Sequence, residues 1–191
     1  MTQSTRNLLV LCGVSGSGKS TLEANLIDAR PELFHKWQQI STRKPRQGER
    51  MGDPYIFVER ETFHHLKDKL VGRLGLAEGS IFPELYGSIP DFVEGKISTI
   101  ILAEEAILDL KREISDGNLQ LDNVFIFGLD VKFEDLNPKD LRDGRDQKFV
   151  DTERSVLNQA DMVHRTSNGR YCDPKVVIAV LEANGFDIGN K

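Results

Sequence analysis

A glycine-rich stretch near the N-terminus contains the residues best suited to chemistry. Residues 13–21 read GVSGSGKST and match the pattern G-x-x-x-x-G-K-[ST] at every position. In such a loop, backbone N–H groups surround a phosphate chain, the lysine amine reaches the β- and γ-phosphates, and the hydroxyl ligates Mg²⁺. The pattern therefore predicts a site for a nucleoside triphosphate with Mg²⁺, with Ser20 on the metal. The predicted nucleotide-binding residues are Gly13, Ser15, Gly16, Ser17, Gly18, Lys19, Ser20 and Thr21.

The residues on either side of this loop indicate how it is positioned. Residues 7–12 are apolar, as in a short buried strand of a parallel sheet. Residues 21–27 have apolar side chains at helical spacing, with Leu22 and Leu26 four positions apart. Glycines between a strand and a helix adopt backbone angles that a Cβ forbids. An ordinary Gly/Ser turn that opens a helix is the alternative, and the lysine and hydroxyl in register argue against it.

Composition excludes several classes of protein. A chain of 191 residues with 39% hydrophobic and 29% charged residues is typical of one globular domain. Its net charge of −5, from 30 acidic and 25 basic residues, argues against a nucleic-acid partner. No apolar run approaches the roughly 20 residues that span a bilayer, and residues 1–6 lack the apolar core of a signal peptide. We therefore expect a cytoplasmic protein without membrane contact, in which Cys12 is a buried thiol and Cys172 an incidental one.

Strand and helix signals alternate along the chain, which favours an α/β fold with a parallel sheet and helices on both faces. The predicted strands are Leu8–Cys12, Tyr55–Val58, Thr99–Ala103, Val124–Leu129 and Met162–His164. The predicted helices are Ser20–Ala29, Glu61–Leu70, Glu104–Ile114 and Pro174–Ala183.

Two segments interrupt this alternation within the single domain expected over residues 1–191. Residues from about 34 to 94 hold short β-like pieces, a helix and scattered glycines, and are interpreted as a small lobe. Residues 137–154 are crowded with charge and are interpreted as a short mobile lid, with a solvated helix face as the alternative. The core would then comprise residues 1–33, 95–136 and 155–191.

A second motif contains two arginines close together. Residues 41–49 read STRKPRQGE, in which Arg43 and Arg46 lie on either side of Pro45. A turn containing proline can present both guanidinium groups to one phosphate, whose oxygens match their planar, bidentate geometry. Two nearby arginines alone are usually surface charges, so the surrounding pattern decides the interpretation.

That surrounding pattern resembles the guanylate kinase family. The motif T-R-x-x-R-x-G-E is followed by G-x-x-Y-x-F at Gly52, Tyr55 and Phe57, and a Y-G-[ST] element begins at Tyr86. The resemblance implies a P-loop NTPase fold of three α/β/α layers, with a central parallel sheet, a small β-containing lobe that binds the nucleoside monophosphate, and a short lid. It also implies phosphotransfer from ATP, with Mg²⁺, to that monophosphate.

Residue roles carried over from the resemblance fall into two groups. The acceptor phosphate would be held by Arg43, Arg46, Tyr55 and Tyr86. Lys19 and Arg43, with the lid arginines Arg145 and Arg154, would stabilise charge on the transferred phosphoryl group.

The positions that read the guanine base in this family are altered. Gln39 stands where the family has serine, and ungapped counting places Ala77 at a glutamate position that Glu78 would fill after a shift of one residue. After the strand at residues 99–102, the first of two acidic positions is Leu102 and the second is Glu104. Ser88 is retained. The predicted base-binding residues are therefore Gln39, Glu78, Ser88 and Glu104.

The leading hypothesis is a kinase that phosphorylates GMP or dGMP to the diphosphate. Alternatives are a kinase of the same fold for a different or modified (deoxy)nucleotide or for ribose 1,5-bisphosphate, and a non-catalytic binding module. The complete P-loop argues against the binding module, and the complete arginine motif argues against the sugar kinase. The expected partners are ATP and a nucleoside monophosphate, with the chain a monomer or a homodimer.

Overall fold

The computed structural model describes residues 5–76, 80, 82–136, 146–166 and 171–189. The chain divides into two compact units. The first unit comprises Met1–Lys36, Phe92–Glu104 and Leu121–Lys191, and the second comprises Trp37–Asp91 and Glu105–Gln120.

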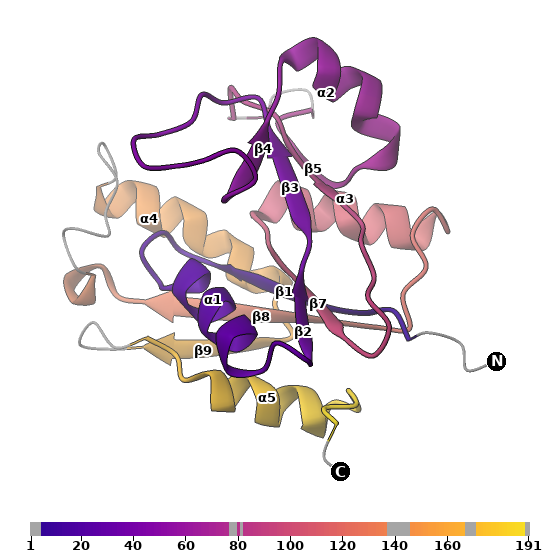
Figure 1. The fold of residues 1–191 in the computed structure, drawn as a ribbon. Coiled ribbons are helices and arrows are strands. Elements are labelled where there is room, and N and C mark those ends of the chain that lie inside the picture. The colour runs from indigo at the N-terminus through magenta and orange to yellow at the C-terminus, as the bar shows by residue number, and fades with distance from the viewer. Residues whose placement is uncertain (1–4, 77–79, 81, 137–145, 167–170, 190–191) are drawn as a thin grey trace. The chain divides into compact units, whose positions relative to one another are not determined.

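A parallel sheet forms the centre of the first unit (Figure 1). Its described strands run in the order β2-β7-β1-β8-β9, and each neighbouring pair is parallel. Because neighbouring strands are parallel, the chain must cross over between them, as in other α/β folds. The strands are β1 (Asn7–Gly13), β2 (Phe34–Lys36), β7 (Ile97–Ile101), β8 (Asn123–Val131) and β9 (Met162–Thr166).

Alternate residues of β1 pack against different helices. Leu9 and Leu11 are buried in a core with Leu22 of α1 (Lys19–Ala29) and Leu181 of α5 (Pro174–Ala183). Figure 1 shows these two helices beside each other along the sheet. The thiol of Cys12, on the opposite face of the strand, lies 3.9 Å from the Val156 carbonyl oxygen in η3 (Arg154–Gln159). Helical segments therefore cover both faces of the sheet.

A short helix, α4 (Gln147–Glu153), precedes η3 in the first unit. The carboxylate of Asp146 caps it by accepting the Phe149 N–H at 2.8 Å. Val150 is fully buried with Val14 and Val131. The highly charged segment predicted over residues 137–154 therefore packs in its second part, residues 146–154, where the single buried side chain of Val150 anchors the short helix. Residues 137–145 lie outside the described part of the chain.

The second unit has a mixed sheet in the order β4-β3-β6-β5. Strand β3 pairs parallel with β4, whereas β6 is antiparallel to both β3 and β5. Ile40, Phe63, Leu70 and Leu85 form its buried cluster. Its elements are β3 (Gln38–Ser41), β4 (Tyr55–Phe57), α2 (Arg60–Leu66), η1 (Lys67–Lys69), β5 (Val71–Leu74), β6 (Tyr86–Ile89) and all but the first residue of α3 (Glu104–Ser115).

Ion pairs attach α3 to β5 within this unit. The Arg73 guanidinium lies 3.0 Å from the Asp109 carboxylate and also pairs with Glu113. The backbone N–H of Arg73 donates to Asp109 at 2.8 Å. Because Asp109 is buried, these contacts offset the cost of removing its charge from water.

The α/β class expected from the sequence is confirmed. Predicted strands and helices agree with the observed ones to within a few residues, apart from the helix predicted over Glu61–Leu70, which ends at Leu66 and continues as η1. The short strands β2, β3, β5 and β6 were not individually predicted. Within the described ranges, no helix combines the length and the apolarity needed to cross a bilayer.

Candidate functional site

The glycine-rich loop connects β1 to α1, as the sequence predicted. Gly13 has a φ of +136°, and a Cβ there would lie 2.0 Å from the Leu129 carbonyl oxygen of β8. Gly18 has a φ of +88° and immediately precedes α1. Both positions thus require glycine, because the backbone is left-handed and neighbouring atoms occupy the space of a side chain. The loop passes so close to β8 that its path is defined by the sheet.

The Lys19 amine lies against the first residues of the loop. Its Nζ donates to the carbonyl oxygens of Gly13 and Val14, each at 2.8 Å. A lysine held by two backbone carbonyls keeps its charge beside the loop rather than in solvent. This position suits the attraction of an anion to the same loop.

Ser15 shows that the loop can bind an oxyanion. Its backbone N–H donates to one oxygen of the Glu153 carboxylate at 2.7 Å, and its hydroxyl donates to the other at 3.1 Å. The nearby Ser17 hydroxyl is buried and has no hydrogen-bond partner among the described residues. Amide and hydroxyl donors that accommodate a carboxylate also suit a phosphate, which has the same need for donors.

The end of the loop carries the residue that was predicted to bind the metal. Ser20 lies in the first turn of α1 and is exposed, so its hydroxyl is accessible to a ligand. Among the described residues, no group of three or more His, Cys, Asp or Glu side chains could hold a metal ion. Mg²⁺ commonly binds through substrate phosphates and one or two protein oxygens, which a single serine hydroxyl can accommodate.

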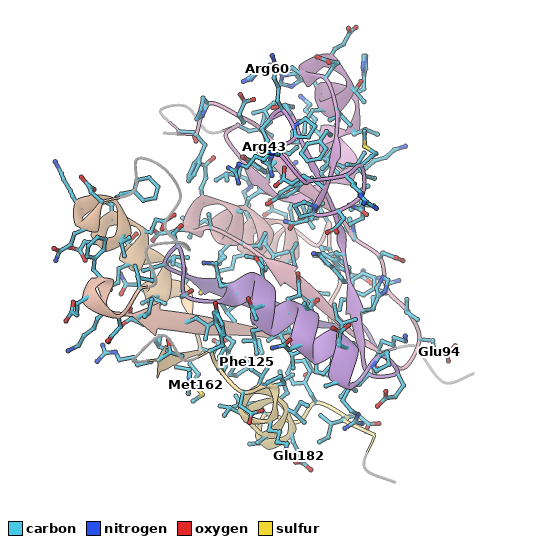
Figure 2. The ribbon with its side chains drawn as sticks, turned by 60° about the vertical axis from the view of Figure 1, so that its left-hand side comes forward. Arg43, Arg60, Glu94, Phe125, Met162 and Glu182 are labelled. Atoms are coloured by element: carbon cyan, nitrogen blue, oxygen red, sulfur yellow. The ribbon has the colours of Figure 1, made fainter. Side chains whose placement is uncertain are left out.

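Arg43 and its partners form the centre of the candidate site in the second unit (Figure 2). Arg43 follows β3 and has 9% of its side chain exposed. Its guanidinium makes a bidentate ion pair with Glu49, with Nη1 2.6 Å and Nη2 2.7 Å from the two carboxylate oxygens. Its guanidinium carbon lies 5.0 Å from the Tyr55 ring centre and 5.1 Å from that of Phe57. Tyr55 in turn packs edge-on against Tyr86, with ring centres 5.6 Å apart. Three of the four predicted phosphate ligands are therefore together.

The fourth predicted phosphate ligand, Arg46, is linked to the same carboxylate through its backbone. Its N–H donates to Glu49 at 2.8 Å. Hydrogen bonds from Arg43, aided by this N–H, lower the pKa of Glu49 from 4.5 to about 2. The same hydrogen bond raises the pKa of Arg43. Glu49 is therefore ionised at neutral pH and fixes the plane of the Arg43 guanidinium.

Two of the predicted base-reading residues face each other across the sheet of the second unit. Gln39 of β3 is directly opposite Ser88 of β6, and its amide nitrogen lies 3.4 Å from the Ser88 hydroxyl oxygen. Ser88 is fully buried, so the Gln39 amide is the more accessible of the pair. The strand register, which places Tyr55 beside Gln39, also puts this pair next to the arginine cluster.

The other predicted base-reading positions lie outside the described part of the second unit. Glu104 belongs to the first unit, where its carboxylate accepts the Ser155 hydroxyl. Leu102 is 4% exposed and apolar, so it offers a base no hydrogen bond. Ala77 and Glu78 lie outside the described residues, as does the predicted lid arginine Arg145.

Arg154, the other predicted lid arginine, is engaged within the first unit. Its guanidinium lies 3.1 Å from the Asp130 carboxylate and 2.7 Å from that of Asp151. It also donates to the Val131 carbonyl oxygen at 3.0 Å. It thus lies at the end of β8, adjacent in sequence to the Glu153 carboxylate that Ser15 binds.

Two site residues were not assigned a role from the sequence. Glu49 was visible in the R-x-G-E pattern, but its part as the partner of Arg43 was not. Glu153 precedes Arg154 among many other charges, and no sequence signal distinguishes it.

The chain is similar in sequence and in fold to known proteins. The sequence model of the guanylate kinase family matches residues 5–127. The guanylate kinase of Wolbachia pipientis wMel is 39% identical over 92 residues, which cover 48% of this chain and 44% of that protein. The guanylate kinase of Lactobacillus delbrueckii subsp. bulgaricus is 29% identical over 185 residues, which cover 96% and 80%.

Less than half the length of the first curated relatives is matched, with 44% of the Wolbachia protein and 44% of the guanylate kinase from Synechococcus sp. (strain CC9902) aligned. Among solved structures, a crystal structure of guanylate kinase from Anaplasma phagocytophilum superimposes with a TM-score of 0.66, covering 98% of this chain and 90% of that one. At 21% identity, this likeness concerns the fold alone.

Proposed function

Because this chain belongs to the guanylate kinase family, we propose that it transfers the γ-phosphoryl group of ATP to a nucleoside monophosphate, with GMP or dGMP as the favoured acceptor. The observation that carries the proposal is the buried Arg43 guanidinium between the Tyr55 ring and a carboxylate that sets its plane. A pre-oriented guanidinium packed against a tyrosine ring suits the oxygens of a terminal phosphate.

The donor triphosphate is assigned to the loop at residues 13–21 of the first unit. The N–H and hydroxyl of Ser15 already bind a carboxylate there, and the buried Ser17 hydroxyl adds a further donor. Lys19 lies beside them with its amine at the loop carbonyls. These groups support binding of the β- and γ-phosphates.

Mg²⁺ is assigned to the same loop, where it would bind together with ATP and have the Ser20 hydroxyl as its protein ligand. The ion would neutralise charge on the β- and γ-phosphate oxygens. The exposed serine at the helix start fits this role.

The acceptor phosphate is assigned to Arg43, Arg46, Tyr55 and Tyr86 in the second unit. Glu49 prevents Arg43 from adopting other rotamers, so little conformational entropy is lost when phosphate binds. Its backbone contact to Arg46 holds the second arginine in the same turn. We therefore assign acceptor binding to the second unit and donor binding to the first.

Transfer itself requires positioning and charge stabilisation rather than a covalent nucleophile. Lys19 and Arg43 would serve the donor and acceptor phosphates, and Arg145 and Arg154 would face the transferred group from the lid. For Arg154 this role requires exchange of its Asp130 and Asp151 partners for phosphoryl oxygens. Closure over the site would exclude water, which competes as an acceptor.

The base is assigned to Gln39 and Ser88, with Glu78 and Glu104 as further candidate contacts. The amide of Gln39 can both donate and accept, so it can pair with more than one base edge. Cytoplasmic location and a monomeric or homodimeric state remain predictions from the sequence.

A coupled ADP-release assay tests the proposal, with ATP, Mg²⁺ and a panel of acceptors: GMP, dGMP, AMP, dAMP, dTMP, CMP, UMP and ribose 1,5-bisphosphate. We expect turnover with GMP or dGMP and loss of at least 10²-fold in Lys19→Met, because the group that meets the transferred phosphate is removed. Lys67→Met, at an exposed lysine of η1, is the matched control.

The panel also separates the alternatives. Turnover of another monophosphate would assign a different base to Gln39 and Ser88. Turnover of the bisphosphate alone would indicate a sugar-phosphate kinase. ATP binding without ADP release for any acceptor would contradict the kinase proposal and favour a binding module.

A further inference from the structure

We propose that Arg165 is a positioning residue for phosphoryl transfer, because it neutralises Asp130 when Arg154 leaves that carboxylate for the transferred group. The inference rests on the proposed function, in which Arg154 stabilises charge on the transferred phosphoryl group. It gives a role to an arginine outside every motif of the sequence, and it does not require Arg165 to touch either substrate. In the same scheme, Asp130 holds Arg154 before ATP binds.

The three charged residues meet at the ends of two neighbouring strands. Strands β8 and β9 are paired in parallel, and their register places Asp130 directly beside Arg165 (Figure 1). The Asp130 carboxylate accepts the Nε–H of Arg165 through Oδ2 at 3.2 Å and the Nε–H of Arg154 through Oδ1 at 3.1 Å. One carboxylate therefore pairs with two guanidinium groups, one on each oxygen.

The exposure of these side chains determines which of the two arginines can leave at low cost. The Asp130 side chain is 11% exposed, whereas that of Arg165 is 83% exposed. A carboxylate largely removed from water is costly to leave without a cation. While Arg154 is in place, the exposed Arg165 adds little to stability. When Arg154 moves away, Arg165 is the cation that remains on the carboxylate, so the movement leaves no unpaired charge behind.

The other contacts of Arg154 oppose its movement less. Its guanidinium donates to Asp151 at 2.7 Å and to the Val131 carbonyl oxygen at 3.0 Å. The Asp151 side chain is 48% exposed, so water can replace the arginine there. Asp130 and both arginines also line one hollow in the first unit, which leaves room for a guanidinium to move. The pair with Asp130 is therefore the contact that sets how often Arg154 is available for transfer.

This scheme predicts opposite effects for two substitutions. Arg165→Gln removes the second cation, so Arg154 should remain on Asp130 and the rate constant of transfer should fall by about three- to fivefold. Arg165→Lys retains the charge and should behave like the parent chain. Asp130→Asn removes the charge that holds Arg154 and should raise the rate constant by about twofold or more. The KM for the acceptor should stay within about twofold in each variant, because acceptor binding is not involved.

Combined variants distinguish this role from simple support of the sheet. If Arg165 acts through Asp130, Arg165→Gln should change the rate constant by less than about 1.5-fold in a chain that already carries Asp130→Asn. It should be equally silent in a chain that carries Arg154→Ala, where no arginine has to leave the carboxylate. A residue that merely supports β9 would lower the rate in every background.

The rate constant is measured by quenched flow under single-turnover conditions, with the full chain in excess over radiolabelled ATP and with Mg²⁺ and saturating GMP. Arg112→Gln is the matched control, because Arg112 is 61% exposed and pairs with the buried carboxylate of Asp109 in the second unit. It should leave the rate constant unchanged. A thermal melt of each variant confirms that the measurements are made on folded protein.

Each contrary outcome is distinct. An unchanged rate with Arg165→Gln, or an equal loss with and without Asp130→Asn, would overturn the inference. A lower rate in Asp130→Asn alone would also overturn it and show that this carboxylate orients Arg154 for transfer. A normal rate in Arg154→Ala would overturn it while leaving the kinase function intact. Failure of the parent chain to release ADP with any acceptor would overturn both the inference and the proposed function.

Discussion

The carboxylate of Glu49 accepts two hydrogen bonds from the Arg43 guanidinium, at 2.6 and 2.7 Å, and one from the backbone N–H of Arg46, at 2.8 Å. One acidic side chain thus holds the guanidinium of Arg43 and the backbone of Arg46. The ring of Tyr55 covers the guanidinium, which limits the access of water to the ion pair. The geometry of this cluster is therefore established before any ligand is present.

Arg43→Lys should lower kcat/KM for the acceptor by about 10²-fold or more, because lysine lacks the planar pair of N–H donors. The KM for ATP should stay within about twofold. Initial rates at varied acceptor and saturating ATP measure the effect. Arg60→Lys is the control in the same unit, where Arg60 is exposed and donates to the Pro83 carbonyl oxygen at 3.1 Å. Equal changes in kcat/KM for ATP and for the acceptor would contradict the assignment of Arg43 to the acceptor phosphate.

The Glu49 pair should make stability depend on pH in the acid range. The pKa of Glu49 is lowered from 4.5 to about 2 in the folded chain, so the unfolded chain takes up the proton first as the pH falls. The stabilisation is fully present above about pH 5 and is lost as the pH falls toward 2. It is worth on the order of 2 kcal/mol at this partly screened position.

Urea unfolding at several pH values between 7 and 3 tests this dependence. Glu49→Gln should be less stable than the parent at pH 7 and should lose less stability on acidification. Glu61→Gln, at an exposed glutamate in the first turn of α2, serves for comparison. If the free energy of unfolding varied with pH in the same way for the parent and for Glu49→Gln, the ion pair between Glu49 and Arg43 would contribute nothing to the pH dependence of stability.

Gln39→Ser should change the preference among acceptors while leaving phosphate transfer intact. It removes the amide that lies 3.4 Å from the Ser88 hydroxyl and restores the residue of the family pattern. We expect the ratio of kcat/KM between GMP and the other monophosphates to rise by about tenfold, because a lost or mismatched hydrogen bond discriminates strongly. The double variant Gln39→Ser with Ala77→Glu should raise this ratio of kcat/KM values further. Unchanged ratios in both variants would remove Gln39 from the base site.

Glu153→Gln should increase the affinity of the loop for phosphate. The Glu153 carboxylate now accepts the Ser15 N–H and hydroxyl, so an incoming phosphate must displace a negative charge from those donors. The neutral amide competes less well, and we expect tripolyphosphate and ADP to bind about three- to tenfold more tightly. Titration calorimetry measures this, with Glu182→Gln on the exposed surface of α5 as control. Weaker binding would instead show that Glu153 helps to shape the loop.

Local patterns were enough to predict the elements around the loop. The apolar run before Gly13 and the helical spacing of Leu22 and Leu26 predicted β1 and α1, because both signals depend on residues close in sequence. Pro174 at the start of α5 marked that helix equally well. The short strands β2, β3, β5 and β6 escaped individual prediction because strands of three or four residues give only a weak alternation signal.

The sequence by itself determined the loop chemistry and the arginine motif, since their function depends on residue type and short spacing. Only the tertiary structure decided which distant groups meet them. Glu153 reaches Ser15 and Tyr171 reaches Gly18 across more than 130 residues of chain, through the packing of the first unit around its parallel sheet. In the second unit, the register of β3, β4 and β6 brings Gln39, Tyr55 and Ser88 together. Strand pairing depends on backbone hydrogen bonds and on packing throughout each unit, so no short stretch of sequence specifies it.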